Sequence, residues 1–152
     1  MNIALCCDHG GLALKNAIMK YLRENGYGTE DFGTTSENSC DYPDFALRAA
    51  EAVAEGKCER GIFVCTTGIG ISIAANKVPG IRCALCCEPL SAKMTRLHND
   101  ANALALGGGI VGVNLALDIV KTFLETPFSE EEKHKRRISK ITAIERKYNK
   151  ER

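Results

Sequence analysis

The chain has 152 residues, 26% of them charged, with a formal net charge of +1. This length predicts a single domain over residues 1–152, and the balanced charge argues against a general binder of nucleic acids or acidic membranes. The first eight residues lack the basic start and long apolar run of a signal peptide, and no apolar run reaches the roughly 18 residues of a membrane span. We therefore expect a cytoplasmic protein with neither nucleic acid nor membrane as a partner.

Apolar segments alternate with amphipathic ones along the chain. The apolar segments predict strands over residues 3–7, 27–32, 61–65, 81–86 and 103–106. The amphipathic segments predict helices over residues 11–25, 43–53, 71–77, 89–96 and 111–124. Continuous apolar strands between helices are typical of a parallel sheet covered on both faces, which is an α/β fold. In such sheets, ligands bind at the carboxyl ends of the strands.

A glycine loop follows the third expected strand, which ends at Cys65. Residues 66–70 read Thr-Thr-Gly-Ile-Gly, and a helix follows them. The glycines let backbone N–H groups converge on an anion, and the helix start adds to that field. Cys65 is therefore a candidate thiolate, although a buried cysteine is often only a small apolar residue. Residues 8–11 follow the first strand, so we expect them at the same edge of the sheet.

Eight cysteines are many for this length, and we expect reduced thiols that fill the core, Cys65 excepted. Cys83 and Cys86 match a C-x-x-C pattern, but residues three apart on a strand face opposite sides and cannot hold one metal ion. The sequence therefore predicts no metal site. Residues 107–112 fit the G-x-G-x-x-G pattern of dinucleotide binding but lack the following strand and acidic residue. We interpret them as a tight turn between a strand and a helix.

The last segment, residues 129–152, is highly charged and carries an apolar stripe at helical spacing. We expect a helix that docks on the body of the protein or on a partner subunit. Lys133 and Arg137 are four residues apart and share one face of this helix. Arg137 also borders the stripe, which is formed by Ile138, Ile141, Ile144 and Tyr148.

Several motifs occur in a characteristic order. They are Cys7-Asp8-His9-Gly10-Gly11, Asp41-Tyr42-Pro43, the loop over 65–70 with its helix to Lys77, Gly80-Ile81-Arg82, and His98-Asn99-Asp100-Ala101-Asn102. With them the chain resembles the type B ribose-5-phosphate isomerases, the family that also holds the galactose-6-phosphate and allose-6-phosphate isomerases. The resemblance implies a three-layer α/β/α Rossmann-like sandwich with a five-stranded parallel sheet of order 2-1-3-5-4. It also implies no metal or cofactor, and a homodimer or dimer of dimers with active sites at the subunit interface.

The resemblance also implies a role for each matching residue. Cys65 would be the base that moves a proton between C2 and C1 of the sugar, with Thr67 beside it. His98 would assist opening of the furanose ring. The N–H groups of Gly68, Ile69 and Gly70 would hold the enediolate. The expected substrate contacts are Asp8, Tyr42 and Asn99 to the sugar hydroxyls, and His9, Lys133 and Arg137 to the phosphate.

Three positions depart from the family pattern. Thr66 stands where the family usually has glycine, and Gly109 and Lys133 stand where it usually has phosphate-binding arginines. Lys133 keeps the charge but loses the bidentate geometry, whereas Gly109 loses the charge altogether. Lys135 and Arg136 are candidates to compensate.

We therefore expect an aldose–ketose isomerase of a sugar phosphate, with ribose 5-phosphate as the first candidate. The weakened phosphate site leaves open a hexose 6-phosphate of the allose or galactose type, or a free sugar. A third possibility is a non-catalytic sugar-phosphate-binding module. A binding module needs no base, so the presence of Cys65, Thr67 and His98 favours an enzyme.

Overall fold

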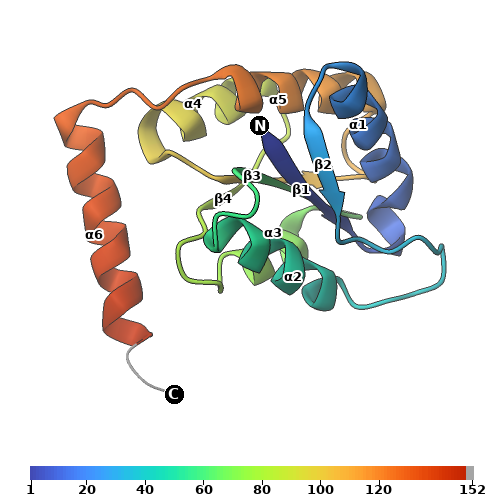
Figure 1. Cartoon of the computed structure of the whole chain (residues 1–152), viewed down its shortest axis with the longest axis horizontal. Coiled ribbons are helices and arrows are strands. Elements are labelled where there is room, and N and C mark those ends of the chain that lie inside the picture. The colour runs from blue at the N-terminus through green and yellow to red at the C-terminus, as the bar shows by residue number, and fades with distance from the viewer. Residues whose placement is uncertain (150–152) are drawn as a thin grey trace.

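The computed structural model describes residues 1–149 and places a parallel sheet between two layers of helices (Figure 1). Within these residues the sheet has five strands in the order β2-β1-β3-β5-β4, and all neighbouring pairs are parallel. The strands are β1 (Asn2–Cys7), β2 (Gly28–Asp31), β3 (Arg60–Cys65), β4 (Cys83–Leu85) and β5 (Ala103–Gly107). The predicted α/β/α sandwich and its strand order are confirmed.

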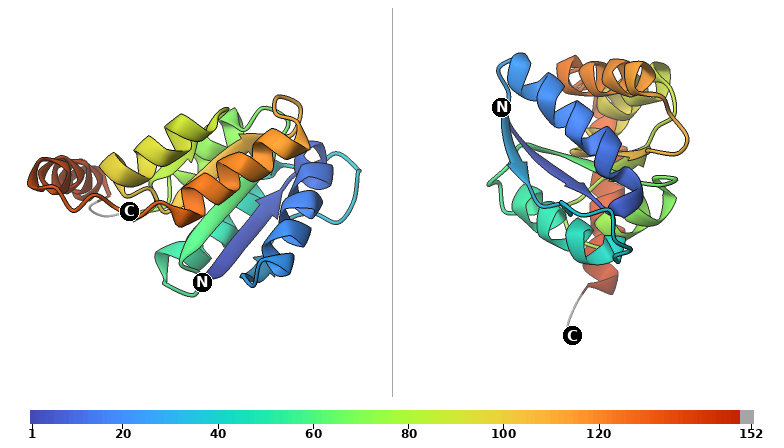
Figure 2. Two further views of the ribbon diagram at one scale, coloured as in Figure 1. Left: turned by 90° about the horizontal axis from the view of Figure 1, so that it is seen from above. Right: turned by 90° about the vertical axis from the view of Figure 1, so that its right-hand side faces the viewer.

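Helices cover both faces of the sheet (Figure 2). One layer holds α1 (Leu12–Glu24), α4 (Pro89–Asn99) and α5 (Val113–Glu125). The other layer holds α2 (Tyr42–Ala54) and α3 (Ile69–Ala75). A short 3-10 turn over His9–Gly11 precedes α1, and α6 (Glu132–Tyr148) follows α5. No helix within residues 1–149 is long and apolar enough to cross a membrane.

The strands are apolar along their whole length because both of their faces are buried. Ile3 and Leu5 of β1 point into the cluster that contains α1 and α5, whereas Ala4 and Cys6 point into the cluster on the side of α2 and α3. Burying a large aliphatic side chain contributes about 1.5–3 kcal/mol, so the Leu- and Ile-rich face carries most of this stabilisation. The opposite face is alanine-rich, which lets α2 approach the sheet closely.

The expectation that all cysteines except Cys65 fill the core is correct for Cys6, Cys7, Cys58 and Cys86, which are buried. Burial raises the pKa of the Cys86 thiol to about 11, which keeps it protonated at neutral pH. Cys83 is half-buried and packs against the core cluster on the side of α2 and α3. The expectation is wrong for Cys87, which is exposed, and for Cys40, which is half-buried in the segment between β2 and α2.

Strand β4 is shorter than the predicted 81–86, and side chains take hydrogen bonds at its first residue and just before it. The Asn76 amide accepts from the backbone N–H of Cys83 at 2.8 Å and donates to the Cys83 carbonyl at 2.9 Å. The backbone N–H of Arg82 donates to Asn102 Oδ1 at 2.9 Å instead of to a strand. An amide side chain thus covers the outer edge of the sheet, where unpaired groups would otherwise favour association with another strand.

Helix α6 lies beyond the β4 edge, at the left of Figure 1, and touches the body mainly near the end of α4. Its apolar stripe is not buried within one chain, since Ile144 is 61% exposed and Tyr148 is 75% exposed. Glu145 anchors the last turn of the helix by accepting a hydrogen bond from the backbone N–H of Gly80 at 3.0 Å. The final residues of the predicted 129–152 segment, 150–152, lie outside the described residues.

Candidate functional site

The loop after β3 folds back onto Cys65, the last residue of that strand. Cys65 is only 4% exposed, and the backbone N–H of Gly68 donates a hydrogen bond to its Sγ at 3.1 Å. Gly68 has φ of +77°, and a side chain there would lie 2.8 Å from the backbone of Leu106. Glycine is therefore required at position 68 both by the backbone conformation and by the close approach of β5. This requirement holds an N–H donor against the sulfur.

The turn after β1 lies directly beside this loop, as the sequence predicts. The backbone N–H of Asp8 donates to the carbonyl of Val64 at 3.3 Å, which joins the ends of β1 and β3. The buried Asp8 carboxylate accepts from the backbone N–H of Gly11 at 3.1 Å, so one of its oxygens shapes the turn. His9 is exposed on this turn. The carboxyl ends of the two strands thus present an acid, an imidazole and a thiol together.

Tyr42 joins the same edge from the first position of α2. Its ring lies over Gly70, where a Cβ atom would come within 2.5 Å of the ring carbon Cζ and 2.7 Å of the hydroxyl. Thr67 Oγ1 accepts from the backbone N–H of Ile69 at 3.3 Å and so helps to shape the loop. We call the following residues the carboxyl-edge group: Asp8, His9, Tyr42, Cys65, Thr67, Gly68, Ile69 and Gly70.

A third loop, after β5, completes this edge. The backbone N–H of Gly108 donates to the carbonyl of Cys65, and that of Gly109 donates to the carbonyl of Thr66, both at 2.8 Å. The backbone N–H groups of Ile110 and Val111 both donate to the Gly107 carbonyl at 3.0 Å, so the prediction of a tight turn over 107–112 is confirmed.

Thr66 sits between two glycines of the neighbouring loops. A Cβ atom at Gly10 would clash with Thr66 Oγ1, and one at Gly109 would lie 3.2 Å from Thr66 Cγ2. The two departures at positions 66 and 109 are therefore in contact, and the Thr66 side chain occupies space that a side chain at position 109 would need.

The remaining predicted site residues lie elsewhere. Helix α4 begins just after β4 and runs back along the sheet, and its 11 residues span about 16 Å. His98 and Asn99, at its end, therefore lie near the amino ends of the strands, opposite Cys65. Lys133 and Arg137 lie on the first turns of α6, which packs against α4. One chain thus does not bring these four residues to the carboxyl-edge group.

His134 is a histidine of this second region that the sequence analysis did not single out. Its ring packs on His98 with 4.4 Å between the ring centroids, and it is 3% exposed. Ser129 Oγ lies 2.7 Å from His134 Nδ1. Burial, and then the nearby His98, lower the pKa of His134. We call the following residues the amino-edge group: His98, Asn99, Lys133, His134 and Arg137.

Two arginines hold the end of α4. Arg82 donates to the carbonyls of Asn99 and Asp100, both at 2.8 Å. The buried Arg96 donates to the Asp100 carboxylate at 2.8 Å and also to the carbonyl of Ala101. Asp100 has φ of +43°, in the left-handed region, so these contacts support a turn that a non-glycine residue adopts at a cost. The backbone that carries His98 is thereby fixed.

The cations of the amino-edge group differ in their availability. Lys133 forms an ion pair with Glu131 at 2.8 Å. Lys135, a candidate to compensate for the missing arginine, pairs with Glu130 at 3.1 Å and with Glu132 at 3.5 Å. Among residues 1–149, no carboxylate pairs with Arg137. Arg137 therefore offers its full charge to a ligand.

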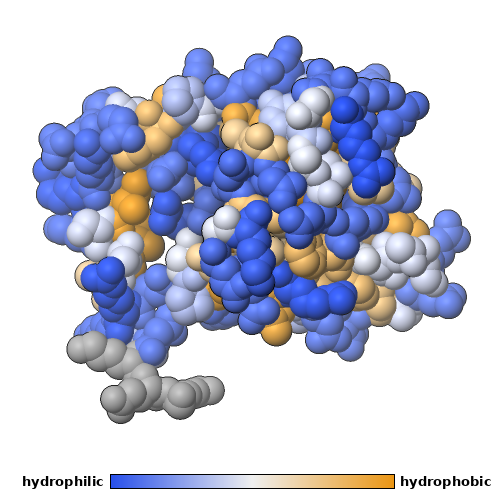
Figure 3. Space-filling model, in the orientation of Figure 1, coloured by the Kyte–Doolittle hydropathy of each residue, from blue (hydrophilic) through white to orange (hydrophobic). Residues whose placement is uncertain are grey.

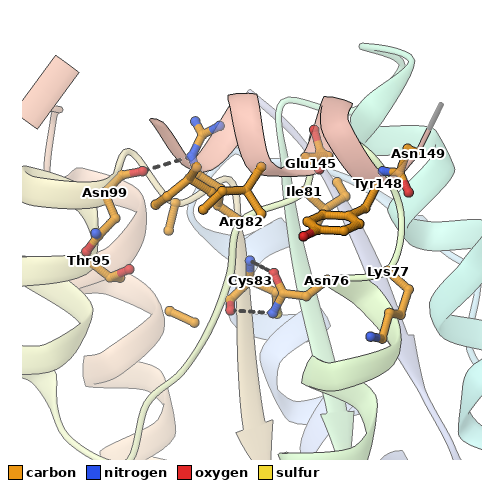
Figure 4. A pocket seen from close by; sticks show the side chains of 14 residues that line it. Asn76, Lys77, Ile81, Arg82, Cys83, Thr95, Asn99, Glu145, Tyr148 and Asn149 are labelled. Carbon is orange, nitrogen blue, oxygen red and sulfur yellow. Dashed lines mark hydrogen bonds between the residues drawn. The ribbon is translucent and has the colours of Figure 1, made fainter. Parts of the chain in front are cut away.

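A groove of about 500 Å³ separates α6 from the β4 edge of the body, beside the amino-edge group (Figure 4). Its walls include Arg82 and Asn99 on one side and Ile141, Ile144 and Tyr148 of α6 on the other. The space-filling view shows a strip of hydrophobic residues along α6 on this face (Figure 3). The groove does not include Cys65, so it is separate from the carboxyl-edge group. Within the described part of the chain, no cluster of three or more His, Cys, Asp or Glu residues is placed to hold a metal ion.

Comparison with known proteins agrees with this geometry. The model of the ribose/galactose isomerase family matches residues 3–141. The chain belongs to this family. It is 48% identical to ribose-5-phosphate isomerase B of Escherichia coli strain K12 over 147 residues, which cover 97% of this chain and 98% of that protein. Membership in the ribose/galactose isomerase family confirms the resemblance and makes the chain an enzyme, a sugar isomerase.

Solved structures of this family match closely in three dimensions. The structure of Clostridium thermocellum ribose-5-phosphate isomerase B superposes with a TM-score of 0.96 at 54% identity, covering 98% of this chain and 100% of that chain. The Mycoplasma genitalium ribose-5-phosphate isomerase B, solved with bound ribulose 5-phosphate, gives a TM-score of 0.91 at 37% identity, with 95% and 96% of the two chains covered.

Proposed function

We propose that this sugar-phosphate aldose–ketose isomerase interconverts ribose 5-phosphate and ribulose 5-phosphate, with Cys65 as the base. The observation that carries the proposal is the hydrogen bond from the Gly68 N–H to Cys65 Sγ at the carboxyl edge of the sheet. This contact fixes the sulfur at the point where the N–H groups of the loop converge. The relatives named ribose-5-phosphate isomerase B, one of them solved with ribulose 5-phosphate, support the choice of substrate.

The reaction moves hydrogen without net oxidation of the substrate. The Cys65 thiolate takes the proton from C2 of the open-chain aldose, and an enediolate forms across C1 and C2. The same sulfur returns a proton to C1, while a proton passes from O2 to O1 and leaves the carbonyl at C2. The step needs donors for the enediolate oxygen, and fixed backbone N–H groups provide them with little reorganisation. Gly68, Ile69 and Gly70 are our candidates, with Thr67 beside them.

We further propose that the enzyme is a homodimer in which the partner's amino-edge group covers the carboxyl-edge group. His98, Asn99, Lys133 and Arg137 lie too far from Cys65 to share one sugar phosphate with it within a chain. The exposed stripe of α6 and its groove supply apolar surface of the kind that a second subunit covers. The charged segment 129–149 would then dock on the partner.

Subunit complementation tests both proposals together. Cys65→Ser removes the base from the carboxyl-edge group, and His98→Asn removes the ring-opening histidine from the amino-edge group. On cyclic ribose 5-phosphate, Cys65→Ser alone should be nearly inactive, and His98→Asn alone should lose activity by about ten-fold or more. An equal mixture that exchanges subunits should regain about a quarter of the unmodified activity, because half of the dimers would hold one intact site. No recovery despite proven subunit exchange would contradict a shared site.

The pairing of Lys133 with Glu131 and the absence of a side chain at Gly109 favour a second candidate substrate, a hexose 6-phosphate or a free sugar. Turnover measured on pentose phosphates, hexose phosphates and the free sugars separates these possibilities. A higher kcat/KM for ribose 5-phosphate than for any other sugar would support the first proposal.

The state of the cysteines supports a cytoplasmic enzyme. All eight thiols are free, and four of them are buried in the core in addition to Cys65. Reduced thiols persist in the cytosol, where disulfides are rare. Fractionation of the source cells, with the enzyme followed by antibody, would test this location.

A further inference from the structure

The ring of His9 is held by the segment between β2 and α2. The backbone N–H of Cys40 donates to His9 Nδ1 at 3.3 Å, and Cys40 Sγ lies 3.8 Å from the same nitrogen. The two residues are 31 positions apart, and His9 is otherwise exposed on the turn after β1. Cys40 takes no part in the proposed proton transfer or in the proposed contacts with the substrate.

The direction of this hydrogen bond decides the form of the ring. A backbone amide can only donate, so Nδ1 must offer its lone pair, and the proton of the neutral ring is on Nε2. The thiol of Cys40 can also donate toward Nδ1, and this contact likewise keeps the proton of the neutral ring on Nε2. Because the two ring nitrogens point in different directions, the Nε2–H group faces away from Cys40 and is free to donate to a ligand.

We propose that Cys40 is a positioning residue: its backbone N–H, aided by its thiol, orients His9 so that Nε2–H donates to the phosphate of the substrate. This inference rests on the proposed function, in which His9 is a phosphate ligand. His9 then contributes a directed neutral hydrogen bond, and Arg137 of the second subunit supplies charge.

The position of Cys40 in the chain links this contact to the rest of the carboxyl-edge group. Asp41 separates Cys40 from Tyr42, whose ring lies over Gly70. One short segment therefore places both the support of His9 and the tyrosine beside the Cys65 loop. A shift of this segment would move both groups, whereas a change confined to the Cys40 N–H would act on His9 alone.

The test measures the affinity of the full chain for inorganic phosphate by calorimetry. Cys40→Pro removes the N–H donor, and Cys40→Ala is the matched control that removes only the thiol. We expect Cys40→Pro to weaken phosphate binding by about two- to ten-fold, the effect of losing one neutral hydrogen bond. Cys40→Ala should have a smaller effect. In a labelled sample, the nitrogen signal of His9 Nδ1 should move in Cys40→Pro, because Nδ1 loses its donor.

A double-mutant cycle separates positioning from a distorted loop. In a His9→Ala background, Cys40→Pro should cause no further loss of phosphate affinity, because the ring that it supports is gone. An equal loss in both backgrounds, or no loss in either, would overturn the inference. If His9→Ala alone leaves the affinity unchanged, both the inference and the assignment of His9 to the phosphate fail. If the phosphate affinities follow the expected pattern but the unmodified protein has no isomerase activity, the proposed function fails and the role of Cys40 stands.

Discussion

The two groups of candidate site residues are built in different ways. The carboxyl-edge group is held by backbone: Cys65 ends a buried strand, and Gly68 adopts a conformation that other residues rarely take. The amino-edge group consists of side chains at the end of one helix and the start of another. Its members are mostly exposed, and only His134 among them is buried.

This contrast indicates that the carboxyl-edge group serves proton transfer and that the amino-edge group serves recognition of the phosphate. Proton transfer to and from carbon needs a base and donors whose positions vary little, and a loop packed between three strand ends provides them. Recognition of a phosphate tolerates longer side chains because charge acts over a greater distance. Substitutions in the carboxyl-edge group should therefore lower kcat, and substitutions of the phosphate-binding cations should raise KM.

The largest effect should come from the carboxyl-edge group. Cys65→Ser is nearly isosteric, and a serine hydroxyl is a much weaker base, so kcat should fall by about a thousand-fold or more. Cys86→Ser is the matched control, because it changes a buried thiol on the other side of the sheet. That variant should unfold at a lower urea concentration yet keep its activity per folded molecule. Comparable kcat values for Cys65→Ser and the unmodified enzyme would refute the assignment of the base.

Arg137→Ala should damage substrate binding instead of the chemical step. A charge-assisted hydrogen bond contributes about 1.5–3 kcal/mol, so KM for a sugar phosphate should rise by about ten- to a hundred-fold. KM for the matching free sugar should hardly change. Lys133→Ala, at a lysine already paired with Glu131, should have a smaller effect. Equal losses with both kinds of sugar would remove Arg137 from the phosphate site.

His98→Asn should distinguish ring opening from positioning. Turnover of a cyclic sugar phosphate should fall by about ten-fold or more, because general acid–base assistance is lost. A substrate supplied in its open-chain form bypasses this step and should lose much less. The measurement is the initial rate with each form at saturating concentration. The same loss with both forms would show that His98 serves the reaction in another way.

A smaller effect on KM is expected at Thr66 and Gly109, the two neighbouring positions that depart from the family pattern. The backbone of Gly109 is not in the left-handed region, and a new Cβ there would lie 3.1 Å from the Thr66 carbonyl oxygen and 3.2 Å from the Thr66 methyl group. Of these two atoms, Thr66→Gly removes only the methyl group. We expect the double variant Thr66→Gly with Gly109→Arg to lower KM for a sugar phosphate by a few-fold. Gly109→Arg alone should gain less. Additive effects of the two changes would show that the positions are not coupled.

The smallest effect concerns the stability of the amino-edge group. The pKa of His134 is lowered in the folded chain, so folding disfavours its protonated form. The stability from this group should therefore be fully present above the ordinary histidine pKa of 6.5 and be lost as the pH falls below it. The charged or titratable neighbours are His98, Glu131, Lys133 and Arg137. His134→Gln should show a weaker decrease in urea stability between pH 7.5 and 5.5 than the unmodified enzyme.

Much of the carboxyl-edge group was accessible from the sequence. Apolar runs that end at Asp8 and Cys65 place both residues at the same edge of any parallel sheet, and the glycines after Cys65 mark the loop. The distance of His98 from Cys65 also follows from topology, since a helix after a parallel strand runs back toward the amino edge. The alternation of strands and helices in the sequence therefore already indicates that one chain forms only part of the predicted site.

The remaining features depend on contacts that have no periodic signal. The burial of His134 depends on how Ser129 and the linker before α6 cross the end of α4. The contact of Cys40 with His9 joins two irregular segments, and the side chain of Asn76 pairs with the outer edge of strand β4. In each case a side chain replaces a regular backbone partner, and only the folded chain brings the two together.

Helix α4 has a consequence for communication between active sites. Its first turn follows Leu85, which lies against Gly68 of the Cys65 loop, and its last turn carries His98. In the proposed homodimer, the two ends of this helix belong to different catalytic centres. A substitution that shifts α4 along its axis would then disturb both centres, one through the contact of Leu85 with Gly68 and the other through His98. In mixed dimers that contain one such subunit, both active sites should lose activity, which turnover per intact site would measure.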